Sequence, residues 1–237
     1  MTLLILSDIH GNWPALKAVL AAEPQYSAVA FCGDVVDYGP QPVDCLRWVT
    51  QDVDYAVRGN HDNALGFGAR CYCMATLREY SVATREWHRT LLSEANCEAL
   101  RRLPRLHSFE WDGQQFLMAH AMPFRVAHTT PQNGLFEYLD LDQWGERMKG
   151  VSSDFVLVGH THVQGVRTFG KVTVVNPGSV GLARDHPGKA CYAVFHDGKI
   201  ELKQIAYEVG RTAALLRAAP LSSRVIEGLV HALGYED

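Results

Sequence analysis

The sequence has no excess of basic residues: 22 lysines and arginines stand against 26 aspartates and glutamates, for a formal net charge of -4 at pH 7. A nucleic-acid-binding surface depends on such an excess, so contact with nucleic acid would need a local basic patch. No apolar run reaches the roughly 20 residues of a transmembrane helix. The first seven residues lack the basic segment of a signal peptide and run directly into a polar motif. We therefore expect a cytoplasmic protein that does not enter a membrane.

The six cysteines are also too few and too scattered for a disulfide framework or a typical zinc site. Cys32 and Cys191 lie in apolar runs typical of buried strands. Cys71 and Cys73 form a tighter pair, but no second pair accompanies them at zinc-site spacing. With no signal peptide expected, we predict reduced, structural cysteines and no thiolate metal site.

Strand and helix patterns alternate at the start of the chain. Apolar runs predict strands at 3–6, 29–32 and 55–57, and helical spacing predicts helices at 13–22 and about 42–50. Asn12 is a plausible N-cap of the first helix, with Pro14 in its first turn. This alternation predicts a mostly parallel sheet with its functional residues at the carboxyl ends of the strands.

The pattern becomes helical from Ala64 to about Leu103, where charged residues alternate with apolar ones. We interpret this segment as a helical insertion, or cap, which would govern access and specificity. After Pro104 the sequence predicts hairpin turns at Gly170 and Gly198. Strands are predicted at 107–111, 115–119, 155–158, 164–169, 172–176, 191–196 and 200–207, followed by a helical pattern at 211–233. No linker or repeat interrupts residues 1–237, so we predict a single domain with a cap at about 64–103.

Five of the eleven histidines lie in short polar clusters that follow predicted strands. Each cluster alone would be an ordinary turn or a core histidine, but the ordered set indicates one site built from distant segments. Carboxylate, imidazole and amide groups suit divalent metals, and there are enough of them for two ions. The clusters are Asp8-Ile9-His10, Gly33-Asp34-Val35-Val36-Asp37, Gly59-Asn60-His61-Asp62, His120 and Gly159-His160-Thr161-His162.

In order and context these clusters resemble the motifs of the calcineurin-like metallophosphoesterases. The resemblance extends from roughly Leu3 to Tyr207. It implies an α/β fold, a four-layer αββα sandwich of two mixed β-sheets flanked by helices. It also implies a phosphoesterase with two divalent metal ions, for which we expect manganese first and iron, nickel, cobalt or zinc as alternatives.

The family's roles transfer to this sequence position by position. The resemblance implies a first metal on Asp8, His10 and His162, a second on Asn60, His120 and His160, and a bridging carboxylate from Asp34. The two ions would share a water that becomes the attacking hydroxide.

His61 follows a metal ligand directly, and the resemblance implies that it protonates the leaving group. Asp62 is a candidate to fix the His61 ring, and Asp37 is expected to orient a ligand imidazole. The other histidines, His88 among them, are interpreted as structural. The first exception to consider is His128, because it follows the His120 loop.

Two segments resemble the small prokaryotic phosphodiesterase-like branch of the family: Asp37-Tyr38-Gly39-Pro40 and Asn176-Pro177-Gly178-Ser179-Val180-Gly181. Protein Ser/Thr phosphatases have Asp-Arg-Gly in place of Asp37-Tyr38-Gly39, which argues against a phosphoprotein or diadenosine-polyphosphate substrate. Ser179, Arg58 and Arg184 are the candidate phosphate-binding residues, although both arginines could equally be solvated. Ala121 stands where relatives commonly have Gly, which is tolerable unless its φ is positive.

The leading hypothesis is hydrolysis of a small phosphate-ester or nucleotide-type substrate, diesters before monoesters. The alternative is a non-catalytic binding or scaffold protein on the same fold, like the trafficking subunit of this superfamily that has lost catalytic residues. A nuclease would need a basic surface, which the composition does not supply. The sequence leaves the substrate, the metal pair and homo-oligomerisation open.

Overall fold

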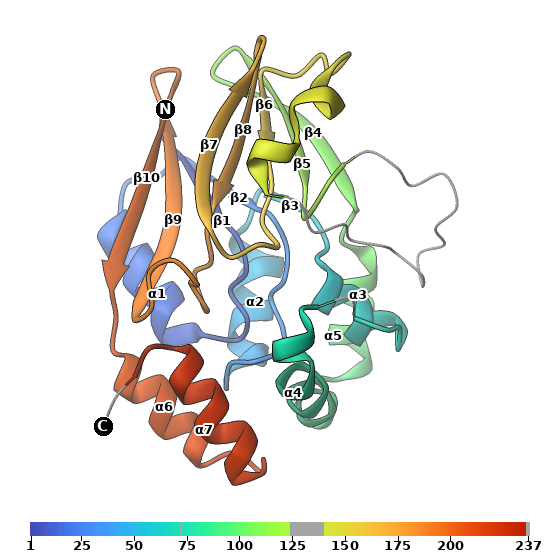
Figure 1. The fold of residues 1–237 in the computed structure, drawn as a ribbon, viewed down its shortest axis with the longest axis vertical. Coiled ribbons are helices and arrows are strands. Elements are labelled where there is room, and N and C mark those ends of the chain that lie inside the picture. The colour runs from blue at the N-terminus through green and yellow to red at the C-terminus, as the bar shows by residue number, and fades with distance from the viewer. Residues whose placement is uncertain (72, 124–139, 236–237) are drawn as a thin grey trace.

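Two five-stranded sheets stack face to face in this computed structural model, which describes residues 1–71, 73–123 and 140–235 (Figure 1). The strand order of the first sheet is β10-β9-β1-β2-β3, and that of the second is β4-β5-β6-β8-β7. The first sheet contains β1 (Leu3–Leu6), β2 (Ala28–Phe31), β3 (Tyr55–Ala56), β9 (Lys189–His196) and β10 (Lys199–Ala206). The second contains β4 (Leu106–Trp111), β5 (Gln114–Ala119), β6 (Phe155–Leu157), β7 (Gln164–Phe169) and β8 (Val172–Pro177).

Both sheets are mixed. Strands β1, β2 and β3 run parallel as the sequence predicts, and so do β5, β6 and β8. The hairpins β4–β5, β7–β8 and β9–β10 add the antiparallel strands, and the last two turn at the predicted glycines. Parallel strands at the centre of each sheet bring several carboxyl ends to one edge of the sandwich.

One hydrophobic core lies between the two sheets, and another lies between the first sheet and its helices. Leu3 and Ile5 of β1 face the second sheet and pack with Phe116, Phe155 and other buried residues. The alternate residues Leu4 and Leu6 face outward, against the helices. Because β1 is covered on both faces, all four of its residues are apolar and buried.

Helices α1 (Trp13–Ala22) and α2 (Pro42–Asp52) cover the outer face of the first sheet, and Asn12 caps α1 as predicted. The 3₁₀ turns η3 (Leu141–Gln143) and η4 (Gly145–Met148) cover the second, where Trp144 and Met148 pack on valines of β6 and β8. The predicted fold of two mixed sheets flanked by helices is therefore confirmed.

The predicted cap is helical and lies beside the carboxyl ends of β2 and β3 (Figure 1). It contains α3 (Asn60–Phe67), η1 (Ala75–Leu77), α4 (Arg78–Leu91) and α5 (Glu94–Arg102), so helical structure begins before Ala64. The C-terminal helical pattern is two helices, α6 (Val209–Arg217) and α7 (Ser223–Ala232), because Pro220 interrupts it.

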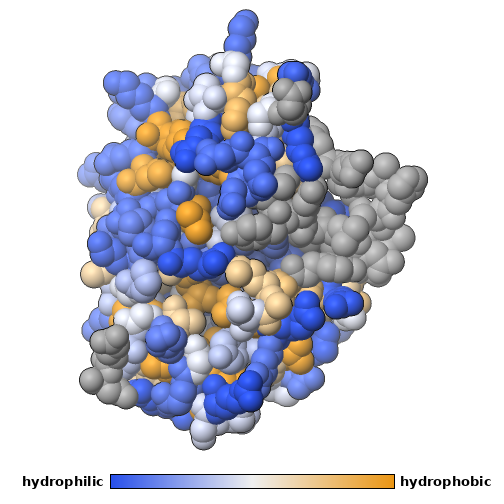
Figure 2. All heavy atoms as spheres, in the orientation of Figure 1, coloured by the Kyte–Doolittle hydropathy of each residue, from blue (hydrophilic) through white to orange (hydrophobic). Residues whose placement is uncertain are grey.

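The described surface in Figure 2 is largely hydrophilic, with apolar side chains in small separate groups. In the part of the chain that is described, every helix is too short or too polar to cross a bilayer.

Candidate metal centre

The predicted ligands do converge, at the carboxyl ends of strands β1, β2, β3, β5 and β6. Asp8, His10 and Asp34 have positive φ values of 53°, 46° and 64°, and His160 and His162 have values of 70° and 57°. Non-glycine residues rarely adopt this conformation, because it costs about 1–3 kcal/mol at each position. Backbone strain is thus concentrated at the candidate ligands, where the tight turns aim side chains into one space.

Glycines precede the ligands because the carboxylates approach the backbone closely. A Cβ at Gly59 would lie 1.9 Å from Oδ1 of Asp34, and one at Gly159 would lie 1.8 Å from Oγ of Ser7. Neither position accepts any side chain without displacing the site. This contact explains the Gly-Asn-His and Gly-His-Thr-His motifs in physical terms.

The first ligand group contains Asp8, His10 and His162. The Nε2 atoms of His10 and His162 lie 3.1 Å apart, and Oδ1 of Asp8 lies 3.2 Å from Nε2 of His162. Each ring uses Nδ1 to donate a 2.8 Å hydrogen bond, to the carbonyls of Val36 and Leu182 respectively. These bonds leave Nε2 lone pairs pointing at one another. Oδ1 of Asp8 is buried without a hydrogen-bond partner in the described chain, so a bound cation fits this space.

The second group contains His120, His160 and Asn60. Oδ1 of Asn60 lies 3.0 Å from Nε2 of His120 and 2.9 Å from Nδ1 of His160. His120 donates from Nδ1 to the carbonyl of Cys32 at 2.8 Å, which again turns Nε2 toward the site. The amide oxygen and two imidazole nitrogens form a donor set that divalent ions of the first transition row accept.

Asp34 lies between the two groups. Its Oδ2 is 2.9 Å from Nε2 of His120, and a carboxylate oxygen also lies within 4.8 Å of ligand atoms of His10 and His61. A carboxylate in this place can contact two ions and reduce their mutual repulsion. The buried Asp and His clusters therefore fit a dinuclear metal centre.

The carboxylates of the site stay ionised in the metal-free protein. Burial raises the pKa of Asp8, but His162 and His120 outweigh it and hold this pKa well below its usual range. Burial also raises the pKa of Asp34, but His120 and His61 outweigh it and lower this pKa. Burial and the positive charge of His120 lower the pKa of His160 to about 3, so this imidazole is neutral and can bind metal.

His61 lies in the first turn of α3. Its Nδ1 faces Asp37, and its Nε2 faces the candidate metal ligand Asp34. Nδ1 is 2.6 Å from Oδ2 of Asp37, while Nε2 lies 3.4 Å from the hydroxyl of Tyr38 and 4.0 Å from Oδ2 of Asp34. Burial lowers the pKa of His61, but Asp34 and Asp37 outweigh it and raise this pKa above its ordinary value. The ring is thus arranged to carry a proton on the nitrogen that faces the site.

Asp62 does not contact the His61 ring, so that prediction was wrong. Its Oδ2 accepts hydrogen bonds from the backbone N–H groups of Asp34 at 2.8 Å and Gly59 at 3.0 Å, and its Oδ1 accepts from Val35 at 2.8 Å. Asp62 therefore holds together the ends of β2 and β3. Asp37 was predicted to orient the imidazole of a metal ligand, and this was also wrong. Asp37 contacts the ring of His61 instead.

Two of the three predicted phosphate-binding residues point elsewhere. Arg58 donates to the carbonyls of Arg101 and Leu103 at 2.7 and 3.1 Å, at the C-terminal end of α5. Ser179 is fully buried and donates a 2.8 Å hydrogen bond to the carbonyl of Asp8. Both residues support backbone around the site, and neither lines its cavity.

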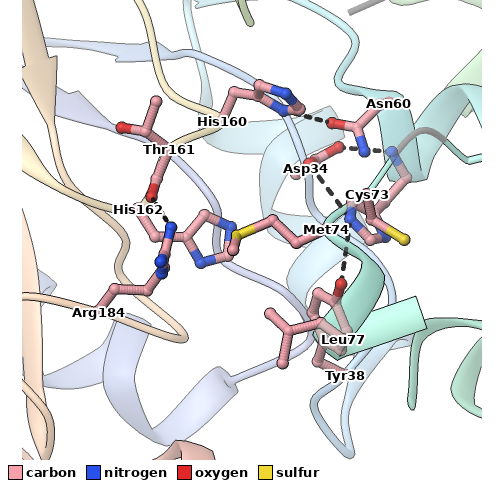
Figure 3. A pocket seen from close by; sticks show the side chains of 11 residues that line it. Asp34, Tyr38, Asn60, Cys73, Met74, Leu77, His160, Thr161, His162 and Arg184 are labelled. Carbon is pink, nitrogen blue, oxygen red and sulfur yellow. Dashed lines mark hydrogen bonds and ion pairs between the residues drawn. The ribbon is translucent and has the colours of Figure 1, made fainter. Parts of the chain in front are cut away.

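Arg184 does line the cavity, which has a volume of about 230 Å³ (Figure 3). Met74 and Leu77 enter from the cap, and Thr161 and Arg184 stand on the other wall. Cys73 also lies on the cap side, and a hydrogen bond from Cys71 outweighs burial and lowers the pKa of its thiol to about 5. The floor is formed by Asp34, Asn60, His61, His160 and His162.

Helix α4 contributes four buried polar residues that the sequence motifs do not assign to the site. Ser81 donates a 3.0 Å hydrogen bond to Oδ2 of Asp37, and Arg85 forms an ion pair with the same oxygen. The signal was present as a polar stripe, Ser81, Thr84, Arg85 and His88, at helical spacing. Such a stripe is usually solvent-exposed, so spacing alone does not identify it as buried.

The same helix fixes the backbone of the Asp37–Tyr38 turn, whose φ values are 66° and 62°. Thr84 accepts a 3.0 Å hydrogen bond from the N–H of Tyr38, and Nδ1 of His88 accepts one of 3.1 Å from the N–H of Asp37. Burial lowers the pKa of His88 to about 4, so the ring is neutral, as an acceptor must be. His88, interpreted as structural, thus supports the residue that orients His61.

The segment after β5 contains Ala121 and His128, the last two residues singled out in the sequence. Ala121 does not have a positive φ, so alanine in place of glycine causes no strain after His120. His128 lies outside the described residues.

Fold and site together define a metallophosphoesterase. The model of a family described as "Calcineurin-like phosphoesterase superfamily domain" matches residues 1–198, and the chain belongs to this superfamily. Its sequence is 30% identical over 225 residues to "Uncharacterized protein MJ0912" of Methanocaldococcus jannaschii, covering 86% of this chain and 87% of that protein. It is 27% identical over 188 residues to "Serine/threonine-protein phosphatase 1" of Salmonella typhimurium, covering 74% and 86%.

A solved structure supports the same assignment. The metallophosphoesterase from Sphaerobacter thermophilus superposes with a TM-score of 0.76 at 25% sequence identity, covering 98% of this chain and 99% of that one. The predicted family and fold are thereby confirmed.

Proposed function

We propose that this protein hydrolyses phosphodiesters with the help of two divalent metal ions. One observation carries the proposal: the imidazole nitrogens of His10 and His162 converge with a buried oxygen of Asp8 that has no hydrogen-bond partner among the described residues. A structural core would not retain this arrangement without a cation, because unpaired buried charges are costly.

The proposed ligands fall into the two observed groups. Asp8, His10 and His162 would hold one ion, and Asn60, His120 and His160 the other, with Asp34 bridging. When bound, the ions would polarise the phosphoryl oxygens and lower the pKa of a water molecule toward neutrality. We propose manganese as the physiological metal, because carboxylate, amide and imidazole donors suit it.

His61 would protonate the leaving oxygen. Asp37 accepts the hydrogen bond from Nδ1–H, which fixes the tautomer and leaves Nε2–H directed toward Asp34 and the cavity. The hydroxyl of Tyr38 lies 3.4 Å from Nε2 and limits the motion of the ring. A general acid in such a position is typically worth about 10²–10⁴ in rate.

The cavity walls favour diesters over monoesters. Among the described lining residues Arg184 is the one lysine or arginine, and the cap contributes the apolar side chains of Met74 and Leu77. A diester carries one negative charge and two organic groups, which matches one cationic side chain beside the metals and an apolar wall. A monoester dianion would favour a second cationic side chain, and Arg58 does not line the cavity but binds the carbonyl of Arg101.

The test compares bis(p-nitrophenyl) phosphate with p-nitrophenyl phosphate, using protein loaded in turn with Mn²⁺, Ni²⁺, Co²⁺ and Zn²⁺. We expect turnover of both, with the higher kcat/KM for the diester. A higher kcat/KM for the monoester would overturn the diester preference, and absence of turnover with every metal would overturn the function.

The scaffold alternative gains no support from the described residues, because the Asp and His candidates lie in compact groups and Oδ1 of Asn60 lies beside His120 and His160. A single domain of residues 1–237 with a cap at about 64–103, a cytoplasmic location and a small phosphate-ester or nucleotide-type substrate remain our predictions.

A further inference from the structure

Two thiols lie beside His61 on the cap side of the cavity. The sulfur atoms of Cys71 and Cys73 and a ring nitrogen of His61 all lie within 4.8 Å of one another. We propose that His61, Cys71 and Cys73 form a third metal site, selective for a thiophilic divalent ion such as Zn²⁺, and that this ion inhibits the enzyme by occupying His61.

The ligand chemistry separates this site from the dinuclear centre. Two cysteines and one histidine, with an open fourth position, are a donor set that Zn²⁺ accepts in tetrahedral geometry. The dinuclear centre offers only oxygen and nitrogen donors, which suit Mn²⁺. Thiolates bind Mn²⁺ weakly, so the two metals would distribute between the sites according to their softness.

The surroundings favour sulfur as an anionic ligand. Nδ2 of Asn60 donates a 3.0 Å hydrogen bond to Sγ of Cys71, and Ser81 hydrogen-bonds Cys73. The guanidinium of Arg85 adds a positive charge near both thiols. Such donors and charges stabilise the thiolate of Cys73, which is the metal-binding form of cysteine. The hydrogen bond with Cys73 and burial raise the pKa of Cys71, so an ion that binds Cys71 would displace its proton.

An ion also has a route to the site. Cys73 is only partly buried and lines the cavity, on the side opposite Arg184 (Figure 3). Cys71 lies behind it, buried against Asn60. An ion that enters the cavity therefore meets Cys73 and His61 without any opening of the core.

The inhibitory effect rests on the proposed function of His61. If the ion binds Nε2, the nitrogen that faces the leaving group can no longer hold a proton. If it binds Nδ1, the hydrogen bond to Asp37 is lost, and that bond fixes the tautomer. Either geometry prevents leaving-group protonation while the dinuclear ligands stay in place.

Cobalt gives a test that is independent of activity. Co²⁺ bound to thiolate has a strong charge-transfer band in the near ultraviolet, and Co²⁺ bound only to oxygen and nitrogen does not. Titration of metal-free, phosphine-reduced protein should produce this band, and Cys71→Ser and Cys73→Ser should each remove or greatly weaken it. Cys97→Ser is the matched control, because Cys97 lies in α5, is also partly buried and is absent from every ligand group in the described chain. Absence of the band in the unmodified protein, or its persistence in the double variant, would overturn the site.

Zinc inhibition tests the consequence. Zn²⁺ added to Mn²⁺-loaded protein should reduce turnover of a dialkyl diester, whose leaving alkoxide needs a proton from His61, and the zinc concentration needed should rise roughly 10-fold or more in Cys73→Ser, each variant being compared with its own zinc-free rate. Equal zinc sensitivity in Cys73→Ser and Cys97→Ser would overturn the inhibitory role.

The two experiments also separate this proposal from the proposed function. A cysteine-dependent cobalt band in a protein without turnover would leave the site standing and remove the phosphodiesterase assignment. Normal diester turnover without a cobalt–thiolate band would support the phosphodiesterase assignment and remove the third metal site.

Discussion

Nδ1 of His61 lies 2.6 Å from Oδ2 of Asp37, and the same oxygen is contacted by Ser81 and Arg85 of the cap helix α4. The candidate general acid is therefore oriented by a carboxylate that the cap itself holds in place. All four side chains are buried. A role for the cap in orienting the proton donor follows, in addition to any role in access.

Asp37→Asn should reduce kcat for the diester by about 10–10²-fold, as loss of an orienting partner does. Because Asp37 helps to raise the pKa of His61, its loss should lower that pKa. His61 would then lose its proton at a lower pH, so the alkaline limb of the rate profile should move to lower pH. The measurement is kcat/KM against pH for the Mn²⁺-loaded protein.

Asp62→Asn is the comparison for that experiment. Asp62 accepts three backbone N–H groups and does not contact the His61 ring, so its loss should lower the melting temperature without moving the alkaline limb. A shifted limb in Asp62→Asn together with an unshifted one in Asp37→Asn would contradict our assignment of the two carboxylates.

His61→Gln should damage turnover most for poor leaving groups. A p-nitrophenolate leaves readily without a proton, whereas an alkoxide needs one from the general acid. The loss in kcat should therefore be larger by roughly 10-fold or more for a dialkyl diester, which must expel an alkoxide, than for bis(p-nitrophenyl) phosphate. Metal content by elemental analysis controls for damage to the dinuclear centre. Equal losses for both leaving groups would argue against proton donation by His61.

The convergence of the candidate metal ligands could be predicted because their signals are local. Asp8, Asp34 and Asn60 each follow an apolar strand, and parallel strands bring such positions to one edge. The partner of His61 could not be predicted in the same way. Asp62 is its neighbour in sequence, but the turn after β2 brings Asp37 to the ring, and that contact is tertiary.

Tertiary contacts also explain what the sequence does not show about Arg58 and the cysteine pair. Arg58 precedes the Gly-Asn-His motif, yet its side chain turns to the carbonyls that end α5. The Cys71–Cys73 pair lacked a second cysteine pair in sequence, and the structure supplies His61 as the neighbouring third donor. Counting cysteines by spacing cannot reveal a ligand group that is completed by a histidine from another segment.

Thr84→Val should destabilise the turn that contains Tyr38. The substitution preserves shape but removes the acceptor for the N–H of Tyr38, and an unsatisfied buried N–H costs about 1–3 kcal/mol. Chemical denaturation should show this loss, together with a lower kcat. Arg89→Ala on the exposed face of α4 is the control. Its free energy of unfolding should stay within about 0.5 kcal/mol of that of the unmodified protein. A similar stability for both variants would mean that α4 does not hold the turn.

Arg184→Ala should impair substrate binding, whereas Arg58→Ala should impair stability. Arg184 lines the cavity, so its loss should raise KM for the diester by roughly 10-fold, the equivalent of one charge-assisted hydrogen bond. Arg58 is buried against the end of α5, so its loss should lower the melting temperature and leave KM unchanged. Steady-state kinetics and thermal unfolding of both variants check this, and a raised KM in Arg58→Ala alone would reverse our placement.

Removal of the metals should destabilise the protein more at alkaline pH. In the metal-free site, burial lowers the pKa of His120, but Asp34 and Asp8 outweigh it and raise this pKa to about 9. A raised folded-state pKa contributes stability below the ordinary histidine value, about 6.5, and this contribution is lost as pH rises through about 9. The metal-loaded protein has no such dependence on a proton, because the ions neutralise Asp34 and Asp8 and bind better as histidines deprotonate. The difference in melting temperature between loaded and chelator-treated protein should therefore grow from pH 6.5 to pH 9, as scanning calorimetry at matched ionic strength would show. A difference that shrinks over this range would mean that the buried carboxylates are not the groups that the metals neutralise.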